Sequence, residues 1–288
     1  MAVTTTTTTT AEKQKSDVIL QYLRPRKKFP SVWCAGCGNG IVMSALIRAI
    51  DRLAIPKDNI IMVSGIGCTS RMPVYLDFNS LHTAHGRALA FATGAKFAQP
   101  HMKVIVITGD GDALAIGGNH FIHACRRNID ITCILINNQI YGMTGGQGSP
   151  TTPSGAFSST TPYGNVEKQF DPCSLAIAAG ASFVGRHTVH HAAQLEKMIM
   201  QAIEHHGFSL VEAISNCHTY YGRLNRSGDA VAMIKGFKEN AVMVAKAKEM
   251  SPEDLRGKHV VGVLHEIEKT EFCDEYQLMV DRLKGGQR

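Results

Sequence analysis

Four of the eight cysteines stand in stretches that predict loops, where thiolates are free to bind metal. Cys34 and Cys37 form a close pair in a glycine-rich stretch, whereas Cys68 and Cys217 are isolated along the chain. Four loop thiolates can hold a [4Fe–4S] cluster, and zinc also accepts four thiolates. Structural zinc sites usually present two close cysteine pairs, so the single pair favours the cluster. The remaining cysteines are interpreted as small buried side chains or inert thiols: Cys125, Cys133, Cys173 and Cys273.

A glycine-rich acidic stretch, Gly109-Asp110-Gly111-Asp112, is followed further along the chain by Asn137-Asn138. The combination resembles the diphosphate-binding motif of thiamine-diphosphate enzymes. Glycines let the backbone approach a diphosphate, and N–H groups that open the next helix stabilise its negative charge. The resemblance implies that Asp110, Asn138 and the main-chain carbonyl of Ile140 supply hard oxygen ligands to Mg²⁺. Alone, each stretch could be a turn or a strand end, but their occurrence together favours the cofactor site.

The same resemblance implies which side chains and backbone groups surround the cofactor. They belong to the stretches that follow three expected strands, and they are Ile66, Gly67, Cys68, Thr69, Gly111, Asp112, Gly142 and Met143. His85 either reaches this pocket or makes a structural hydrogen bond. No catalytic residue of this chain is assigned.

The pattern of short β-branched runs alternating with longer amphipathic segments predicts βα units around a mostly parallel, doubly wound α/β sheet. The expected strands span residues 59–63, 103–107, 131–136, 182–184 and 209–214, and the expected helices span residues 41–53, 87–97, 118–127, 172–179 and 192–206. Ligands of doubly wound sheets bind at the carboxyl ends of the strands. The chemical motifs are therefore expected to converge on one site.

The chain divides by pattern into three parts. Residues 1–30 form a threonine-rich tail with a basic arm, residues 31–226 form the cofactor and cluster domain, and residues 227–288 form a C-terminal helical extension. No strand is expected after Arg226. Residues 142–165 are too rich in Gly, Pro, Ser and Thr for regular structure, and such a long loop is usually functional.

Composition excludes several classes of function. The net charge is +6, but the basic residues are scattered apart from the cluster at residues 24–28, so nucleic-acid binding is not expected. No apolar run is long enough to span a bilayer, and the N-terminus lacks the apolar core of a secretory signal. We therefore expect a cytoplasmic protein whose cysteines are reduced or bound to metal rather than paired in disulfides.

Together, the motifs resemble the β subunit of 2-oxoacid:ferredoxin oxidoreductases, in particular the two-subunit type that includes 2-oxoglutarate synthases. The resemblance covers most of residues 30–226 and rests on residues 33–38, 65–68, 82–88, 109–112 and 137–147. It implies that Cys34, Cys37, Cys68 and Cys217 ligate one [4Fe–4S] cluster. The threonine-rich N-terminus has no counterpart in the family.

The resemblance also implies an activity and its partners. A 2-oxoacid would be oxidatively decarboxylated with coenzyme A, electrons would pass through the cluster to ferredoxin, and the reverse reaction would fix CO₂. An α subunit would supply the pyrimidine-binding half and the activating glutamate, in a dimer of αβ pairs. The favoured substrate is 2-oxoglutarate, with pyruvate as the alternative. Arg71 or Arg87 could bind its distal carboxylate, or each could be structural and the partner subunit could supply the cation instead.

Two other readings stay open at this point. A non-redox thiamine-diphosphate lyase would share Asp110 and Asn138 but would give the four loop cysteines no task. A zinc-stabilised binding module would use Cys34 and Cys37 but would leave the stretch from Gly109 to Asp112 unexplained.

Overall fold

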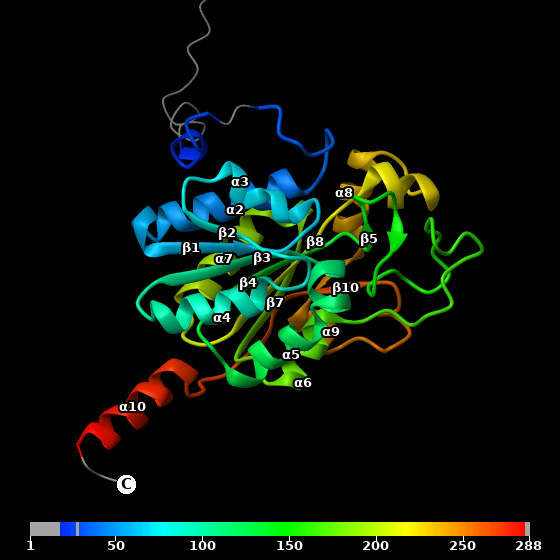
Figure 1. The fold of residues 1–288 in the computed structure, drawn as a ribbon. Helices are drawn as coiled ribbons and strands as arrows, with labels where there is room; N and C mark the ends of the chain where they lie inside the picture. Colours follow the sequence, from blue (N-terminus) through cyan, green and yellow to red (C-terminus); the bar gives the residue numbers. More distant parts are fainter. Residues whose placement is uncertain (1–17, 27–28, 286–288) are drawn as a thin grey trace, which may run out of the picture.

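The computed structural model describes residues 18–26 and 29–285, so the threonine run of the tail and two lysines of the basic arm lie outside the described residues. The described part of the chain forms an eight-stranded sheet with the strand order β2-β1-β3-β4-β8-β7-β10-β9 (Figure 1). Neighbouring strands of this sheet run parallel except β7 and β10, which are antiparallel. The predicted doubly wound, mostly parallel sheet is therefore confirmed.

The strands of this sheet are β1 Ile60–Ser64, β2 Asn79–His82, β3 Lys103–Gly109, β4 Thr132–Asn137, β7 Phe183–Thr188, β8 Ser209–Ile214, β9 Ala241–Met243 and β10 His259–Glu266. A separate short hairpin pairs β5 Ile140–Tyr141 with β6 Gln147–Gly148. The helices are α2 Asn39–Arg52, α3 Met72–Tyr75, α4 Ala88–Ala98, α5 Gly118–Arg127, α6 Pro172–Ala179, α7 Ala192–Glu204, α8 Ala230–Asn240, α9 Val244–Ala247 and α10 Phe272–Lys284.

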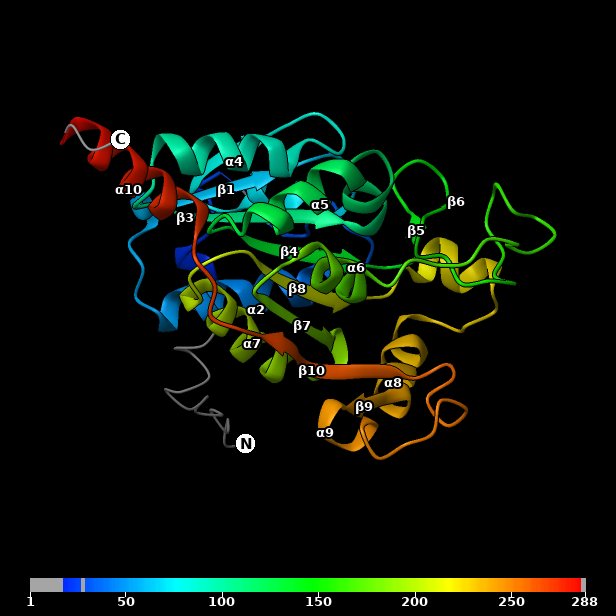
Figure 2. The same ribbon diagram turned by 90° about the horizontal axis from the view of Figure 1, so that it is seen from below.

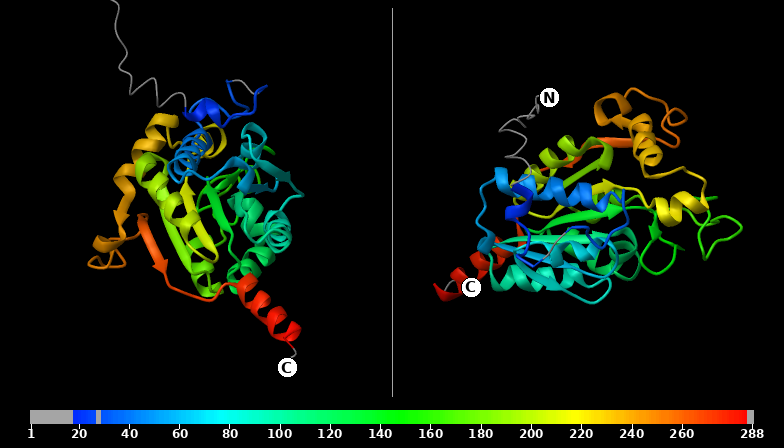
Figure 3. Two further views of the ribbon diagram at one scale, coloured as in Figure 1. Left: turned by 90° about the vertical axis from the view of Figure 1, so that its left-hand side faces the viewer. Right: turned by 90° about the horizontal axis from the view of Figure 1, so that it is seen from above.

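Helices cover both faces of the sheet, which explains why the central strands β3 and β4 are mostly apolar on both sides. Along β3, Ile105 and Ile107 join the core under α2 and α7, whereas Val104 and Val106 join the core under α4, α5 and α6 (Figures 1 and 2). Successive side chains of a strand point to opposite faces, so one β-branched run contributes to both cores. Helix α10 extends away from the sheet (Figure 3).

Each element expected between residues 41 and 214 is present, with its ends shifted by a few residues at most places. The largest difference is β7, which continues to Thr188 instead of ending at Val184. Arg186 lies in this additional part of β7, and its charge interrupts the apolar pattern from which the strand was predicted. Its burial is possible because it forms ion pairs with Glu212 and Asp171.

The prediction that no strand follows Arg226 is wrong. Helix α8 forms within the expected amphipathic segment, but β9 follows it, and β10 joins the main sheet beside β7. Most residues of β10 are only half-buried, so the strand lacks the strongly apolar pattern of β3 or β4. The division between residues 31–226 and 227–288 stays a prediction.

Within the described ranges, no helix combines the length and the apolar character that crossing a membrane requires.

Of the basic arm, Arg24 is not free in solvent. Its guanidinium donates to the main-chain carbonyl of Leu76 at 2.9 Å, which ties the start of the described chain to the loop after α3.

Candidate functional site

A cavity of about 150 Å³ lies where the loops after β1, β3 and β4 meet. These strands are adjacent and parallel, so their carboxyl ends open at the same edge of the sheet. The cavity is lined by every residue that the sequence predicted for the cofactor and for Mg²⁺: Ile66, Gly67, Cys68, Thr69, Asp110, Gly111, Asp112, Asn138, Ile140, Gly142 and Met143. The structure thus brings the separate motifs together, while the role of each residue stays a prediction.

Asp110 is buried at the bottom of this region, with 3% of its surface exposed. Its Oδ2 accepts hydrogen bonds from the hydroxyls of Ser149 at 2.5 Å and Thr151 at 2.7 Å. Burial raises the pKa of the Asp110 carboxyl, and these hydrogen bonds oppose the shift. Among the described residues, no basic side chain forms an ion pair with it. A buried carboxylate without a cationic partner suits a metal ion.

The turn after β4 holds the two other residues predicted to bind Mg²⁺. Gln139 has φ of 63°, in the left-handed region that non-glycine residues rarely adopt and that is common at functional sites. The main-chain N–H of Ile140 donates to Asn138 Oδ1 at 3.3 Å, and both residues line the cavity. The tight turn therefore places the Asn138 amide and the Ile140 backbone beside Asp110, as the magnesium hypothesis requires.

Asp112 ties three loops together at the cavity wall. Its Oδ1 lies 2.6 Å from Nδ1 of His85 and accepts from the main-chain N–H of Gly86 at 2.7 Å, while Thr108 donates to Oδ2 at 2.9 Å. A Cβ on Gly65 would overlap this carboxylate, so that position requires glycine. The two alternatives for His85 are both realised, because it lines the cavity and makes a structural hydrogen bond.

The four loop cysteines also come together. The pKa of the Cys37 thiol is raised to about 12, mainly by burial and in smaller part by the neighbouring thiols Cys217, Cys68 and Cys34. The pKa of Cys68 is raised by burial and then by Cys217 and Cys34. Such mutual influence requires short separations, and it disfavours four free thiolates. A positively charged metal centre would relieve the repulsion, so the donor set fits a metal centre.

The spacing of these thiols argues against a single zinc ion. Tetrahedral zinc with Zn–S bonds of about 2.3 Å needs sulfur atoms about 3.8 Å apart. Among the described residues, no three of the four sulfur atoms lie within 4.8 Å of one another. A larger inorganic core, such as a [4Fe–4S] cluster, accepts thiolates that lie farther apart than the ligands of one zinc ion. The other cysteines are buried, as expected: Cys125, Cys133, Cys173 and Cys273.

Gly142 connects the cavity with the cysteine group. A Cβ built on it would lie 3.5 Å from Sγ of Cys217 and 3.6 Å from Sγ of Cys68. Cys68 itself lines the cavity. Any group held in the cavity therefore lies next to the sulfur atoms, and glycine at position 142 leaves room between them.

Sequence reasoning missed several residues of the site. Tyr141 lines the cavity and donates to the main-chain carbonyl of Gly111 at 3.1 Å, and Thr144 lies at the rim. Ser149 and Thr151 belong to the loop that was expected to be functional, but nothing in the sequence distinguished them from its other hydroxyl residues. Arg87 donates to the main-chain carbonyl of Ile116 at 3.1 Å, which supports its structural role, while Arg71 is exposed.

The mostly parallel sheet and the cavity at its carboxyl edge define a ligand-binding α/β domain. Residues 63–213 match the family model of the thiamine pyrophosphate enzyme, C-terminal TPP binding domain. More specifically, the chain belongs to the 2-oxoacid:ferredoxin oxidoreductases as their β subunit, and the predicted resemblance is confirmed. The readings as a non-redox lyase and as a zinc-stabilised module are therefore set aside.

Similar proteins support this assignment over nearly the whole chain. The chain is 54% identical to the 2-oxoglutarate synthase subunit KorB of Methanocaldococcus jannaschii over 92% of this chain and 98% of that protein. It is 50% identical to the corresponding subunit of Methanothermobacter marburgensis over 94% and 95%. A solved 2-oxoglutarate:ferredoxin oxidoreductase from Magnetococcus marinus, with 2-oxoglutarate, coenzyme A and succinyl-CoA bound, superposes with a TM-score of 0.81 at 32% identity, covering 94% of this chain and 91% of that one.

Proposed function

We propose that the chain is the β subunit of a 2-oxoglutarate:ferredoxin oxidoreductase. The enzyme would convert 2-oxoglutarate and coenzyme A into succinyl-CoA and CO₂, and two electrons would pass singly to two oxidised ferredoxins. The reverse reaction would fix CO₂. The observation that carries the proposal is the contact between the cavity and the cysteine group at Cys68 and Gly142. A plain decarboxylase has no use for an electron acceptor at this position.

The residues of the cavity have distinct tasks in this reaction. When bound, thiamine diphosphate supplies the electron sink for the carbanion left by decarboxylation. Asp110, Asn138 and the Ile140 carbonyl would hold Mg²⁺ and with it the diphosphate. Position 111 requires glycine because a Cβ there would overlap the Tyr141 ring, which packs against the cavity wall. The His85 ring, held by Asp112 at 2.6 Å, presents a hydrogen-bonding group at the cavity wall.

The four cysteines would hold the [4Fe–4S] cluster beside the cavity. A cluster accepts one electron at a time and passes it outward, which suits ferredoxin as acceptor. The side chain of Cys34 is exposed, so this part of the cysteine group lies at the surface of the described chain. The proposed path therefore runs from the cavity, past Gly142 and Cys68, toward the surface at Cys34.

The isolated chain should be inactive. It provides one diphosphate-type domain, and we propose that an α subunit supplies the pyrimidine-binding half and the activating glutamate, with two αβ pairs forming the enzyme. Ferredoxin reduction by the cofactor-loaded chain, measured anaerobically with 2-oxoglutarate and coenzyme A, should be undetectable, and adding the α subunit should restore it. Turnover by the chain alone would show that the activating group lies on this polypeptide.

The assembled enzyme should prefer 2-oxoglutarate to pyruvate by about 100-fold or more in kcat/KM. A site that binds the distal carboxylate through a cation leaves that cation unpaired when the shorter acid binds. The named substrates of the similar proteins support this choice. Steady-state rates with both acids at equal ferredoxin concentration test it. A higher kcat/KM for pyruvate would replace the substrate but keep the reaction class.

A further inference from the structure

Asn137, the first asparagine of the Asn137-Asn138 motif, has no role in the function described so far. It is buried at the end of β4, and its side chain makes contacts in three directions. Its Nδ2 donates to Oε1 of Glu212 at 2.7 Å. Its Oδ1 accepts from the Thr151 hydroxyl at 2.9 Å and from the main-chain N–H of Gln139 at 3.2 Å.

Each contact of Oδ1 leads to a predicted magnesium ligand. The Thr151 hydroxyl also lies 2.7 Å from Oδ2 of Asp110, so Asn137 and Asp110 share the single proton of this hydroxyl. The N–H of Gln139 belongs to the left-handed residue of the turn that presents Asn138 and Ile140. Through the Thr151 hydroxyl and the Gln139 N–H, the Asn137 side chain is therefore linked to all three predicted ligands.

Glu212 determines which way the Asn137 amide points. A carboxylate can only accept hydrogen bonds, so it selects Nδ2, and Oδ1 must then face Thr151 and Gln139. Glu212 lies on β8, next to β4, and is only 1% exposed. A charge buried in a central strand is costly unless it is paired.

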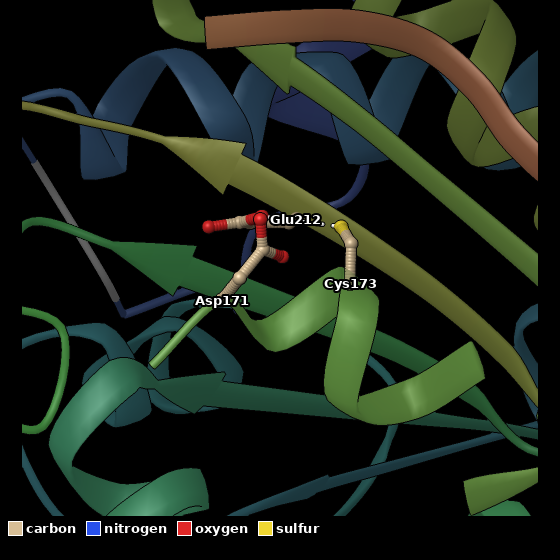
Figure 4. A group of neighbouring side chains, drawn as sticks. All are labelled: Asp171, Cys173 and Glu212. Atoms are coloured by element: carbon tan, nitrogen blue, oxygen red, sulfur yellow. Dashed lines mark hydrogen bonds between the residues drawn. The ribbon is translucent and has the colours of Figure 1, made fainter. Parts of the chain in front are cut away.

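Arg186 supplies that pairing. The strand register places it directly opposite Glu212, and its Nε donates to Oε2 at 2.6 Å. Its second nitrogen donates to Asp171 at 2.6 Å, the residue that caps α6. Figure 4 shows Asp171, Cys173 and Glu212 as close neighbours, with the Cys173 thiol donating to Glu212 at 3.2 Å. Although this trio has the donor types of a metal site, Arg186 already binds both of its carboxylates.

We propose that Asn137 is a positioning residue of the magnesium site and that Glu212, held by Arg186, sets its orientation. The inference rests on the proposed function, because it assumes that Asp110, Asn138 and Ile140 bind Mg²⁺. Asn137 holds the Asp110 side chain through Thr151 and the ligand turn through Gln139. Loss of this support should weaken Mg²⁺-dependent binding without removing any ligand.

The test is calorimetric titration of thiamine diphosphate into the αβ complex at several Mg²⁺ concentrations. Residues that orient metal ligands typically contribute about 10- to 100-fold to metal affinity. Thr151→Val and Glu212→Gln should each weaken the apparent Mg²⁺ affinity by about tenfold or more, and Asn137→Ala by more than either. Thr151→Ser, which keeps the hydroxyl, should remain near the parent complex.

Glu196→Gln is the matched control. Glu196 is also a buried glutamate, and it is paired with Arg48 and Arg52 at 2.9 and 2.7 Å, away from the cavity. Its replacement should lower the thermal midpoint but leave the Mg²⁺ dependence unchanged. If Asn137→Ala does not fold, Thr151→Val and Glu212→Gln decide the question.

The Asp110→Asn variant distinguishes a wrong positioning role for Asn137 from a wrong assignment of the magnesium site. If Asp110→Asn abolishes Mg²⁺-dependent binding while Thr151→Val and Glu212→Gln match Glu196→Gln, the positioning role is wrong and the magnesium site stands. If Asp110→Asn also binds normally, the proposed magnesium site itself is wrong. A weakened affinity in Thr151→Val that Thr151→Ser restores would support the positioning role.

Discussion

Alanine at any one of Cys34, Cys37, Cys68 and Cys217 should remove most of the iron from the anaerobically purified complex and abolish ferredoxin reduction. The four thiols are mutually close, and a [4Fe–4S] cluster requires a ligand on each iron atom. Without the cluster, electrons have no one-electron exit from the cavity. Iron content and the electron paramagnetic resonance of the reduced protein measure the effect.

The four variants should differ in a second property, thiamine diphosphate affinity. Cys68 lines the cavity and Cys34 does not, so Cys68→Ala should alter cofactor affinity while Cys34→Ala leaves it close to the parent value. Cys133→Ala is the control, because this cysteine is fully buried in β4 and outside the group. A variant of the group that keeps its full iron content and an unchanged spectrum would remove that residue from the ligand set.

Asp110→Asn should weaken Mg²⁺-dependent binding of thiamine diphosphate by at least about 100-fold, more than loss of a supporting contact does. The amide lacks the charge that attracts Mg²⁺. It also has a single oxygen, so if that oxygen accepts from Ser149 and Thr151, as Oδ2 does now, the other position carries a nitrogen that cannot bind the metal. Chelation of Mg²⁺ from the parent complex should release the cofactor in the same way. Both effects are measured by calorimetry on the assembled enzyme.

Asp130→Asn provides the comparison for this variant. Asp130 is also buried, and it pairs with Lys96 at 2.6 Å away from the cavity. Its replacement should reduce stability because Lys96 loses its partner, yet leave the Mg²⁺ dependence intact. Equal cofactor affinity in Asp110→Asn and the parent would contradict a ligand role for Asp110.

Local patterns predicted the sheet well because each βα unit is encoded within a short stretch. The runs at β3 and β4 are apolar on both faces, as in a parallel strand that helices cover on both sides. Strand β10 escaped prediction for the opposite reason. It is half-buried. It reaches its place beside β7 only because the chain returns to the sheet after forming α8, β9 and α9.

The sequence by itself determined the donor types of the candidate site and their place at the ends of strands. The position of each motif directly after a strand was sufficient to predict that the motifs form one site, because the carboxyl ends of adjacent parallel strands lie together. The placement at strand ends together with the family resemblance therefore predicted Asp110, Asn138 and the four loop cysteines without knowledge of side-chain contacts.

Only the tertiary structure decided how those donors are held. Asn137 and Glu212 are 75 positions apart, and Thr151 lies in a loop whose many hydroxyls look alike in the sequence. Their contacts arise from the order β4-β8-β7 and from the path of that loop over the sheet edge. No local propensity encodes such a contact, because a buried hydrogen bond forms between groups that meet only after the sheet has assembled.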